Sequence, residues 1–173
     1  MEQRIEYGKV APGALGAMFG LERYVHESGL EPSLVHLVKM RASLINGCAY
    51  CVDMHSKDAR AAGESEQRLY ALAVWRETPF YTPRERAALE WTEALTLIHQ
   101  NDVPDELYAR VREELSESEL VDLSMAIVAI NGWNRLAVAF RAPVGSYQPA
   151  ASQAAATPPA AARPAAEASA VPV

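Results

Sequence analysis

Apolar residues recur at helical spacing along most of the chain, and this periodicity limits the possible fold more than any other feature. Between residues 32 and 45, for example, Leu34, Leu37, Val38 and Leu44 form a single stripe, as expected of an amphipathic helix. No segment alternates apolar and polar residues for long, as a half-buried strand would. The sequence therefore predicts an all-α fold.

Helix start and stop signals divide this pattern into about seven helices. Gly29, Asn46-Gly47 and Gly63 are stop signals, because glycine and asparagine adopt the left-handed conformation that ends a helix. Thr82-Pro83 and Ser116 begin helices as caps, each with Glu three residues later. The expected helices cover residues 12–26, 32–45, 48–62, 64–76, 83–100, 104–115 and 120–140, with Asn131-Gly132 interrupting the last.

The 173 residues divide into one folded unit and a tail. The last 24 residues hold 12 Ala and four Pro and nothing larger than Val among their apolar side chains, so they cannot bury enough surface to offset the entropy of ordering. We predict a folded domain over residues 1–145 and a flexible Ala/Pro tail over 146–173. Within the domain, Val121–Ile130 has little polar face, which predicts burial against other helices and self-association.

Charge and cysteine usage exclude several classes of protein. The net charge of −6 argues against a nucleic-acid binder, which would carry a basic surplus. No run approaches the roughly 20 apolar residues that cross a membrane, and no apolar stretch follows the charged N-terminus as in a secretory signal. We therefore expect a cytoplasmic protein without membrane partners. In a reducing cytosol its two cysteines are more often chemical than structural.

The two cysteines and one histidine share one helical stripe. Cys48, Cys51 and His55 are spaced i, i+3, i+7 and directly follow the break at Asn46-Gly47, which places both thiols in the first turn of a helix. The free N–H groups and the positive end of the helix dipole stabilise a thiolate there. These residues supply a nucleophile, a resolving thiol and a base, the parts of a dithiol redox site.

Other arrangements fit the same residues less well. Free cysteines also pack in cores as small hydrophobes, and a zinc site could use Cys48, Cys51 and His55 with His36 as fourth ligand. Structural zinc ligands usually come from two separated elements, and the chain has no second CxxC. A c-type haem site requires His directly after the second Cys, where Val52 stands. A thioredoxin-like fold would place the pair after a strand.

Three segments resemble the alkylhydroperoxidase D-like proteins of the carboxymuconolactone decarboxylase superfamily. They are residues 40–55 (MRASLINGCAYCVDMH), 69–76 (LYALAVWR) and 131–137 (NGWNRLA), and the resemblance covers about residues 7–142. It implies an all-helical protein that assembles into trimers or hexamers and reduces peroxides without a cofactor or metal. By this resemblance Cys51 is the peroxidatic thiol, Cys48 resolves it, and His55 relays protons.

One position departs from the family pattern. More distant members often carry Glu twelve residues before the first cysteine, where this chain has His36. An imidazole can also donate or accept a proton near neutral pH, so His36 is the candidate relay residue. The sequence thus predicts a cytosolic dithiol peroxidase that takes a peroxide substrate and an external dithiol, thioredoxin-type or lipoyl-type, as reductant. The alternatives are a redox sensor or a thiol–disulfide oxidoreductase, either without peroxidase turnover, and a lactone decarboxylase, whose family members do not use CxxC.

Overall fold

The computed structural model describes residues 2–100 and 102–149, which form eight α-helices and one 3₁₀ helix. They are α1 (Tyr7–Val10), α2 (Pro12–Glu27), α3 (Pro32–Ile45), α4 (Ala49–Ala61), α5 (Glu66–Ala71), η1 (Leu72–Glu77), α6 (Pro83–Thr96), α7 (Asp105–Glu114) and α8 (Glu117–Phe140). No strand occurs within these ranges, and the predicted all-α fold is confirmed. Most of the predicted tail, from residue 150 onward, lies outside the described residues.

Apart from shifts of a few residues at helix ends, the helices differ from the predicted ones in three places. The short α1 was not expected, and the helix expected over 64–76 divides into α5 and η1, where Val74 leaves helical backbone angles. The interruption expected at Asn131-Gly132 does not occur, because α8 continues through it. A Cβ on Gly132 would lie 2.9 Å from the Cε atom of Met18. This glycine therefore lets α2 approach α8 closely instead of ending the helix.

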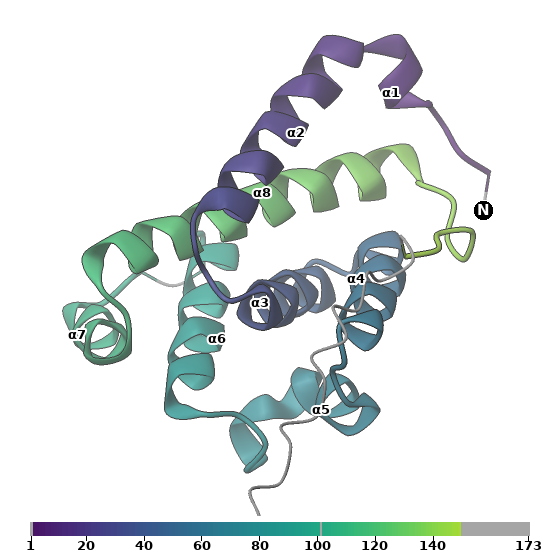
Figure 1. Ribbon diagram of the computed structural model, residues 1–173. Helices are drawn as coiled ribbons and strands as arrows, with labels where there is room; N and C mark the ends of the chain where they lie inside the picture. Colours follow the sequence, from purple (N-terminus) through teal and green to yellow (C-terminus); the bar gives the residue numbers. More distant parts are fainter. Residues whose placement is uncertain (1, 101, 150–173) are drawn as a thin grey trace, which may run out of the picture.

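Helix α3 lies at the centre of the fold. It packs against α4, α6 and α8, and Figure 1 shows it nearly end-on between these three helices. Leu37 and Val38 on α3 are fully buried, with Leu89 of α6 and Ile127 of α8 in the clusters around them. The stripe predicted over 32–45 therefore faces two apolar clusters at once.

The last helix is the most apolar in the molecule. By length and composition alone α8 is long and apolar enough to cross a membrane, with a mean hydropathy of 1.3 over its most apolar window. In the structure α8 packs against α2, α3, α4 and α6 as a core helix. Ile127 and Ile130 are buried, whereas Val121 and Val128 face outward and are more than half exposed.

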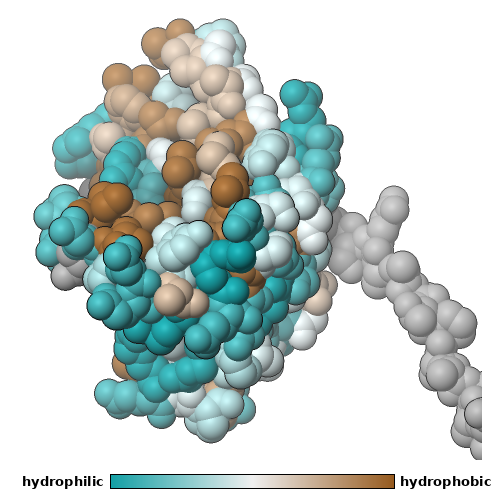
Figure 2. Space-filling view, turned by 90° about the vertical axis from the view of Figure 1, so that its left-hand side faces the viewer, coloured by the Kyte–Doolittle hydropathy of each residue, from teal (hydrophilic) through white to brown (hydrophobic). Residues whose placement is uncertain are grey.

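Further exposed apolar side chains lie outside α8. Phe19 on α2 and Val74 on η1 are each more than half exposed, and Tyr24 on α2 nearly so. Figure 2 shows one face of the molecule on which apolar side chains gather in the upper half, above a largely hydrophilic lower half. The exposed apolar side chains are thus concentrated on one part of this face.

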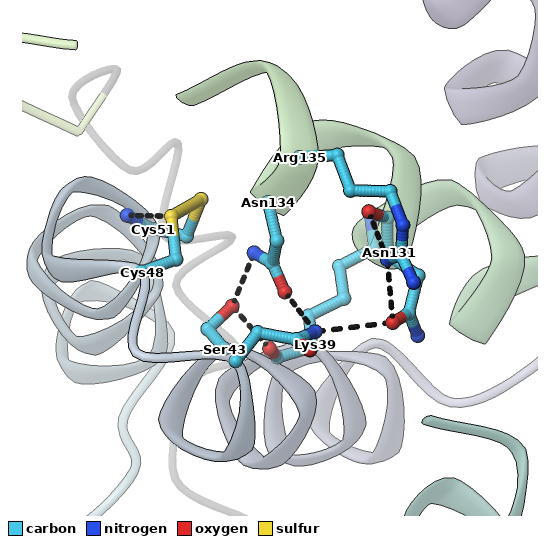
Figure 3. The surroundings of a disulfide bond; sticks show 8 residues. Lys39, Ser43, Cys48, Cys51, Asn131, Asn134 and Arg135 are labelled. Carbon is cyan, nitrogen blue, oxygen red and sulfur yellow. Dashed lines mark hydrogen bonds between the residues drawn. A yellow bond between two sulfur atoms is a disulfide. The ribbon is translucent and has the colours of Figure 1, made fainter. Parts of the chain in front are cut away.

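A buried polar network joins the end of α3 to the middle of α8. Asn134 on α8 donates to the hydroxyl oxygen of Ser43 at 3.0 Å and accepts from the side-chain amide of Asn46 at 2.8 Å. Asn46 also donates to Asn131, and Ser43 donates to the backbone oxygen of Lys39. Figure 3 shows this network beside the cysteine pair. The two bonds of Ser43 are buried and the two of Asn46 are partly buried, so the network fixes the position of the turn that follows α3.

Removing the centre of this network should destabilise the protein. Asn134→Ala leaves Ser43 and Asn46 without their shared partner in a site where Asn134 itself is 1% exposed, and we expect the free energy of unfolding to fall by about 2 kcal/mol. Urea unfolding measures this, with Val138→Ala at a half-exposed position of the same helix as control. The control should change stability by less than about 0.5 kcal/mol. Equal losses in the two variants would contradict the role of the network.

Candidate functional site

The chain turns sharply between α3 and α4, and the turn ends at Cys48. Gly47 adopts a left-handed φ of 64°, which a glycine accepts without steric cost. The backbone N–H of Cys48 then bonds to the backbone oxygen of Ser43 at 3.0 Å. Cys48 is the N-cap residue of α4, and its sulfur accepts the N–H of Cys51 at 3.3 Å. A sulfur thus occupies the position that an oxygen of Ser, Thr or Asp usually takes at a helix start.

Cys48 and Cys51 form a disulfide across the first turn of α4. Their Cα atoms are 5.4 Å apart, within the ordinary range for a disulfide, and the helix continues undistorted beyond them. Each cysteine is only 1% exposed. A reactant can therefore reach the sulfurs only through a cavity.

One cavity of about 520 Å³ leads to this pair, between α2, α3, α4 and α8. Its walls are mostly apolar, with contributions from Leu15, Phe19, Val25, Tyr50, Met54 and Trp133. Cys51 and His55 line the cavity, whereas Cys48 does not. The two thiols that the sequence treats as a pair are therefore unequal: one sulfur faces the cavity, and the other lies behind it as the helix cap.

His55 lies one helical turn after Cys51 and is 6% exposed. Neither of its ring nitrogens has a hydrogen-bond partner among the described residues. Burial, together with the nearby charges of Lys39 and His36, lowers the pKa of His55 to about 3. With the disulfide formed, His55 is thus a neutral imidazole with free nitrogens in the cavity wall.

His36 lines the same cavity from α3 and is half-buried. Burial lowers its pKa, the Asp58 carboxylate opposes that shift, and the Lys39 ammonium adds to it. The structure therefore brings all four predicted site residues together. The cavity is lined by Cys51, His55 and His36, and Cys48 lies in the turn beside it. Among the described residues, no group of three or more His, Cys, Asp or Glu side chains is arranged to hold a metal ion.

Sequence reasoning missed a buried ion pair in the cavity wall. The ammonium of Lys39 on α3 pairs with Glu22 on α2, although the Lys39 side chain is only 9% exposed. The indole N–H of Trp133 donates to the other oxygen of Glu22 at 2.9 Å. Lys39 interrupts an otherwise apolar stripe, and this is the signal in the sequence for a buried charge. Its partner Glu22 is 17 residues away on another helix.

The residues after α8 return to α4. Tyr147 donates its hydroxyl to Asp58 at 2.6 Å, and the backbone N–H of Gly145 donates to Asp53 at 3.3 Å. Burial, together with the Asp58 carboxylate, raises the pKa of Tyr147 to about 12. The phenol therefore stays protonated and holds Asp58 in the cavity wall near His36.

Comparisons with known proteins agree on one family. The model of the carboxymuconolactone decarboxylase family matches residues 12–94, which include both cysteines and His55. The chain is 48% identical over 139 residues to YdfG, an uncharacterized protein of Bacillus subtilis, and the match covers 80% of this chain and 95% of YdfG. A second uncharacterized protein, YnjA of Escherichia coli, is 32% identical over 58% of this chain and 54% of its own length.

Solved structures share the fold. ATU0492 of Agrobacterium tumefaciens, a protein of unknown function with a suggested antioxidant defence role of the AhpD type, is 48% identical with a TM-score of 0.82. The match covers 84% of this chain and all of that one. The debrominase Bmp8 is 22% identical with a TM-score of 0.70, covering 78% of this chain and 73% of its own. At that identity Bmp8 shows a common fold only.

The neutral state of His55 should make stability depend on pH. In the unfolded chain His55 becomes protonated below about pH 6.5. In the folded protein with its disulfide, His55 stays neutral down to about pH 3. The unfolded state then binds more protons as pH falls, so stability is full above pH 6.5 and decreases below it. We expect His55 to account for a loss of about 2 kcal/mol between pH 7 and pH 5.

Urea unfolding of the oxidised protein at both pH values measures this loss. In His55→Gln the side chain cannot titrate, so the difference between the two pH values should shrink by that amount. His36 is present in both proteins and its effect cancels. An unchanged difference would show that His55 is not held neutral by burial.

Proposed function

The chain belongs to the carboxymuconolactone decarboxylase family, and we propose that it is a dithiol peroxidase whose reaction uses Cys51, Cys48 and His55. The family includes enzymes of varied kinds, so membership alone does not select the reaction. The observation that carries the proposal is the position of Cys51, which faces an apolar cavity beside an unpartnered imidazole at the start of a helix. This is the environment of a nucleophilic thiolate.

Cys51 is the thiol that meets the peroxide. Its sulfur borders the cavity, and His55 four residues later has a free nitrogen to take the thiol proton. The first turn of α4 adds free N–H groups and the positive end of the helix dipole. In the reaction the thiolate attacks the terminal peroxide oxygen, an S–O bond forms and the O–O bond breaks. The alkoxide takes a proton and leaves as an alcohol, and Cys51 becomes a sulfenic acid.

Cys48 completes the first half of the reaction. Its thiol attacks the sulfenic sulfur of Cys51, the S–S bond forms, and the hydroxyl group leaves as water after taking a proton. The two thiols together supply the two electrons and two protons that the peroxide consumes. The 5.4 Å separation of the Cα atoms supports this step, because the disulfide fits within the first turn of α4 without unfolding it.

Reduction of the disulfide reverses these roles. The thiolate of an external dithiol attacks Cys51, the sulfur on the cavity side, and Cys48 leaves as a thiolate. The backbone N–H of Cys51 already points at the Cys48 sulfur and stabilises that leaving thiolate. The second thiol of the reductant then closes its own disulfide and releases Cys51. Because both sulfurs are 1% exposed, we propose a reductant with a slender dithiol group, a lipoyl-type arm or an exposed thioredoxin-type motif.

Self-association is part of the proposal. Three large apolar side chains are more than half exposed: Phe19 on α2 and Val121 and Val128 on α8. A second copy of the chain would cover them. The family resemblance favours a trimer or hexamer. The cytoplasmic location expected from the sequence is a further element of the proposal.

Peroxide consumption in the presence of dithiothreitol tests the function. The wild type should consume peroxide with multiple turnovers, and Cys51→Ser should reduce the rate by at least about 100-fold, because no other described cysteine faces the cavity. Cys48→Ser should form a sulfenic acid that a sulfenic-acid probe captures, without forming a disulfide. Equal rates in the wild type and Cys51→Ser would refute the assignment. A single disulfide per molecule without turnover would instead indicate a redox sensor.

A further inference from the structure

Aromatic side chains line the cavity that contains Cys51. Tyr7 comes from α1, Phe19 from α2, Tyr50 from α4 and Trp133 from α8. The volume of about 520 Å³ lies within the range of about 300–1,000 Å³ that is typical of sites for organic molecules, and hydrogen peroxide would fill only a small part of it. Reduction of an O–O bond needs the two thiols and a proton carrier, so the aromatic wall is available to select the substrate.

Phe19 and Trp133 form an aromatic pair at the edge of this cavity. Their ring centroids are 5.5 Å apart and their planes are tilted by 55°, within the favoured range for tilted, edge-to-face pairs. Phe19 is 58% exposed although it lines the cavity, so its ring lies at the entrance, and Trp133 beside it is partly buried. A substrate that enters here therefore passes these two rings on its way to the buried Cys51.

Polar contacts hold Trp133 in place. Its indole N–H donates to one carboxylate oxygen of Glu22 at 2.9 Å, and the other oxygen pairs with the ammonium of Lys39. The side chains of Lys39 and Glu22 are 9% and 27% exposed, so the ion pair is largely screened from water. Glu22 follows Phe19 by three residues, so one turn of α2 contacts Trp133 twice. Since a buried ion pair is seldom more stabilising than well-packed apolar residues, its effect here is to fix the indole in the cavity wall.

The charges in the cavity favour an uncharged substrate. Besides its histidines, the lining holds the charged residues Glu22, Lys39 and Asp58. Glu22 neutralises Lys39, whereas Asp58 accepts the hydroxyl group of Tyr147 and adds a further negative charge. A carboxylate that entered the cavity would lose its hydration without gaining a free cation from these described residues. The cavity is thus suited to an uncharged molecule with an apolar body.

We propose that the cavity takes uncharged aryl hydroperoxides and that Phe19 and Trp133 contact the ring of the substrate. The inference rests on the peroxidase function proposed above and names its substrate class. Aromatic rings attract each other edge to face beyond the gain from buried area, so this contact distinguishes aryl from alkyl hydroperoxides. Glu22 and Lys39 are positioning residues that act through Trp133. The hydroperoxide group meets Cys51, and the product of its reduction is the corresponding alcohol, which keeps the ring.

Binding of the product alcohol tests the site without turnover. The ligands are cumyl alcohol, the product of cumene hydroperoxide, and 2-cyclohexyl-2-propanol, which has the same carbon skeleton with a saturated ring. Ligand-observed NMR titration of the oxidised, full-length protein gives both dissociation constants. Cumyl alcohol should bind about 3-fold more tightly or better, because only an aromatic ring gains from edge-to-face contact. Equal affinities, or tighter binding of the saturated alcohol, would refute aromatic recognition.

Phe19→Leu separates recognition of the ring from self-association. Leucine keeps the position apolar but removes the ring, so the preference for cumyl alcohol should fall by about 2-fold or more. Val121→Ala is the matched control, because Val121 belongs to the same set of exposed apolar side chains but does not line the cavity. This control should keep the wild-type preference. If Phe19→Leu also keeps it, or if both variants lose it equally, the assignment of Phe19 is wrong.

Two substitutions of Glu22 test its positioning role. Glu22→Leu removes both the acceptor for Trp133 and the partner of Lys39, so the preference for cumyl alcohol should disappear. Glu22→Gln keeps an oxygen that can accept the indole N–H, so most of the preference should remain. A merely structural role would weaken the binding of both alcohols equally and leave their ratio unchanged. Loss of the preference in Glu22→Gln as well would contradict positioning through the indole.

Steady-state kinetics with dithiothreitol connect the site to the reaction. The wild type should have a higher kcat/KM for cumene hydroperoxide than for tert-butyl hydroperoxide, which carries a methyl group in place of the ring. In Phe19→Leu this advantage should shrink by about 2-fold or more, through KM and not kcat, because the ring is not part of the O–O bond that breaks. Turnover without a preference for the aryl substrate would refute the aryl specificity alone. Binding of cumyl alcohol without turnover of either hydroperoxide would instead refute the peroxidase function.

Discussion

The hydrogen bonds between Ser43 and Asn134 and between Asn46 and Asn134 fix the geometry on which the site depends. Ser43 also accepts the backbone N–H of Cys48 through its carbonyl oxygen. The middle of α8 thereby determines where α3 ends and α4 begins. Apolar contacts could bring the same helices together, but they are not directional and would leave the turn free to shift. Directional hydrogen bonds, buried or partly buried, set both the position and the orientation of the first turn of α4.

That orientation makes the two cysteines chemically different. Cys48 is the N-cap and its sulfur receives an N–H group, whereas Cys51 in the same turn faces the cavity. A single CxxC thus provides one sulfur suited to meet reactants and one suited to leave as a thiolate. The distinction follows from the helix start, because Cys48 is the N-cap with extended backbone angles, whereas Cys51 lies within the first turn and lines the cavity.

Much of this arrangement was predictable from the sequence because it is local. The stop at Asn46-Gly47, the helix after it and the stripe of Cys48, Cys51 and His55 depend on spacing within a few turns. What could not be predicted depends on contacts between distant segments. The ion pair of Lys39 with Glu22 needs α2 and α3 to pack together. Local signals at Asn131-Gly132 favoured a break, but α8 continues through them, and Gly132 instead makes room for Met18 of α2.

The same distinction explains why His36 was difficult to interpret from the sequence. From its spacing alone His36 is an ordinary position in the first turns of α3. What distinguishes it is that it lines two cavities. His36 lines the apolar cavity that contains Cys51 and also a second cavity of about 310 Å³, whose lining includes Arg68 and its ion-pair partner Glu85. A glutamate at this position would add a negative charge near Asp58, whereas a histidine of lowered pKa stays neutral there. The proximity of Asp58 therefore gives a physical reason why an imidazole suits this position in the chain.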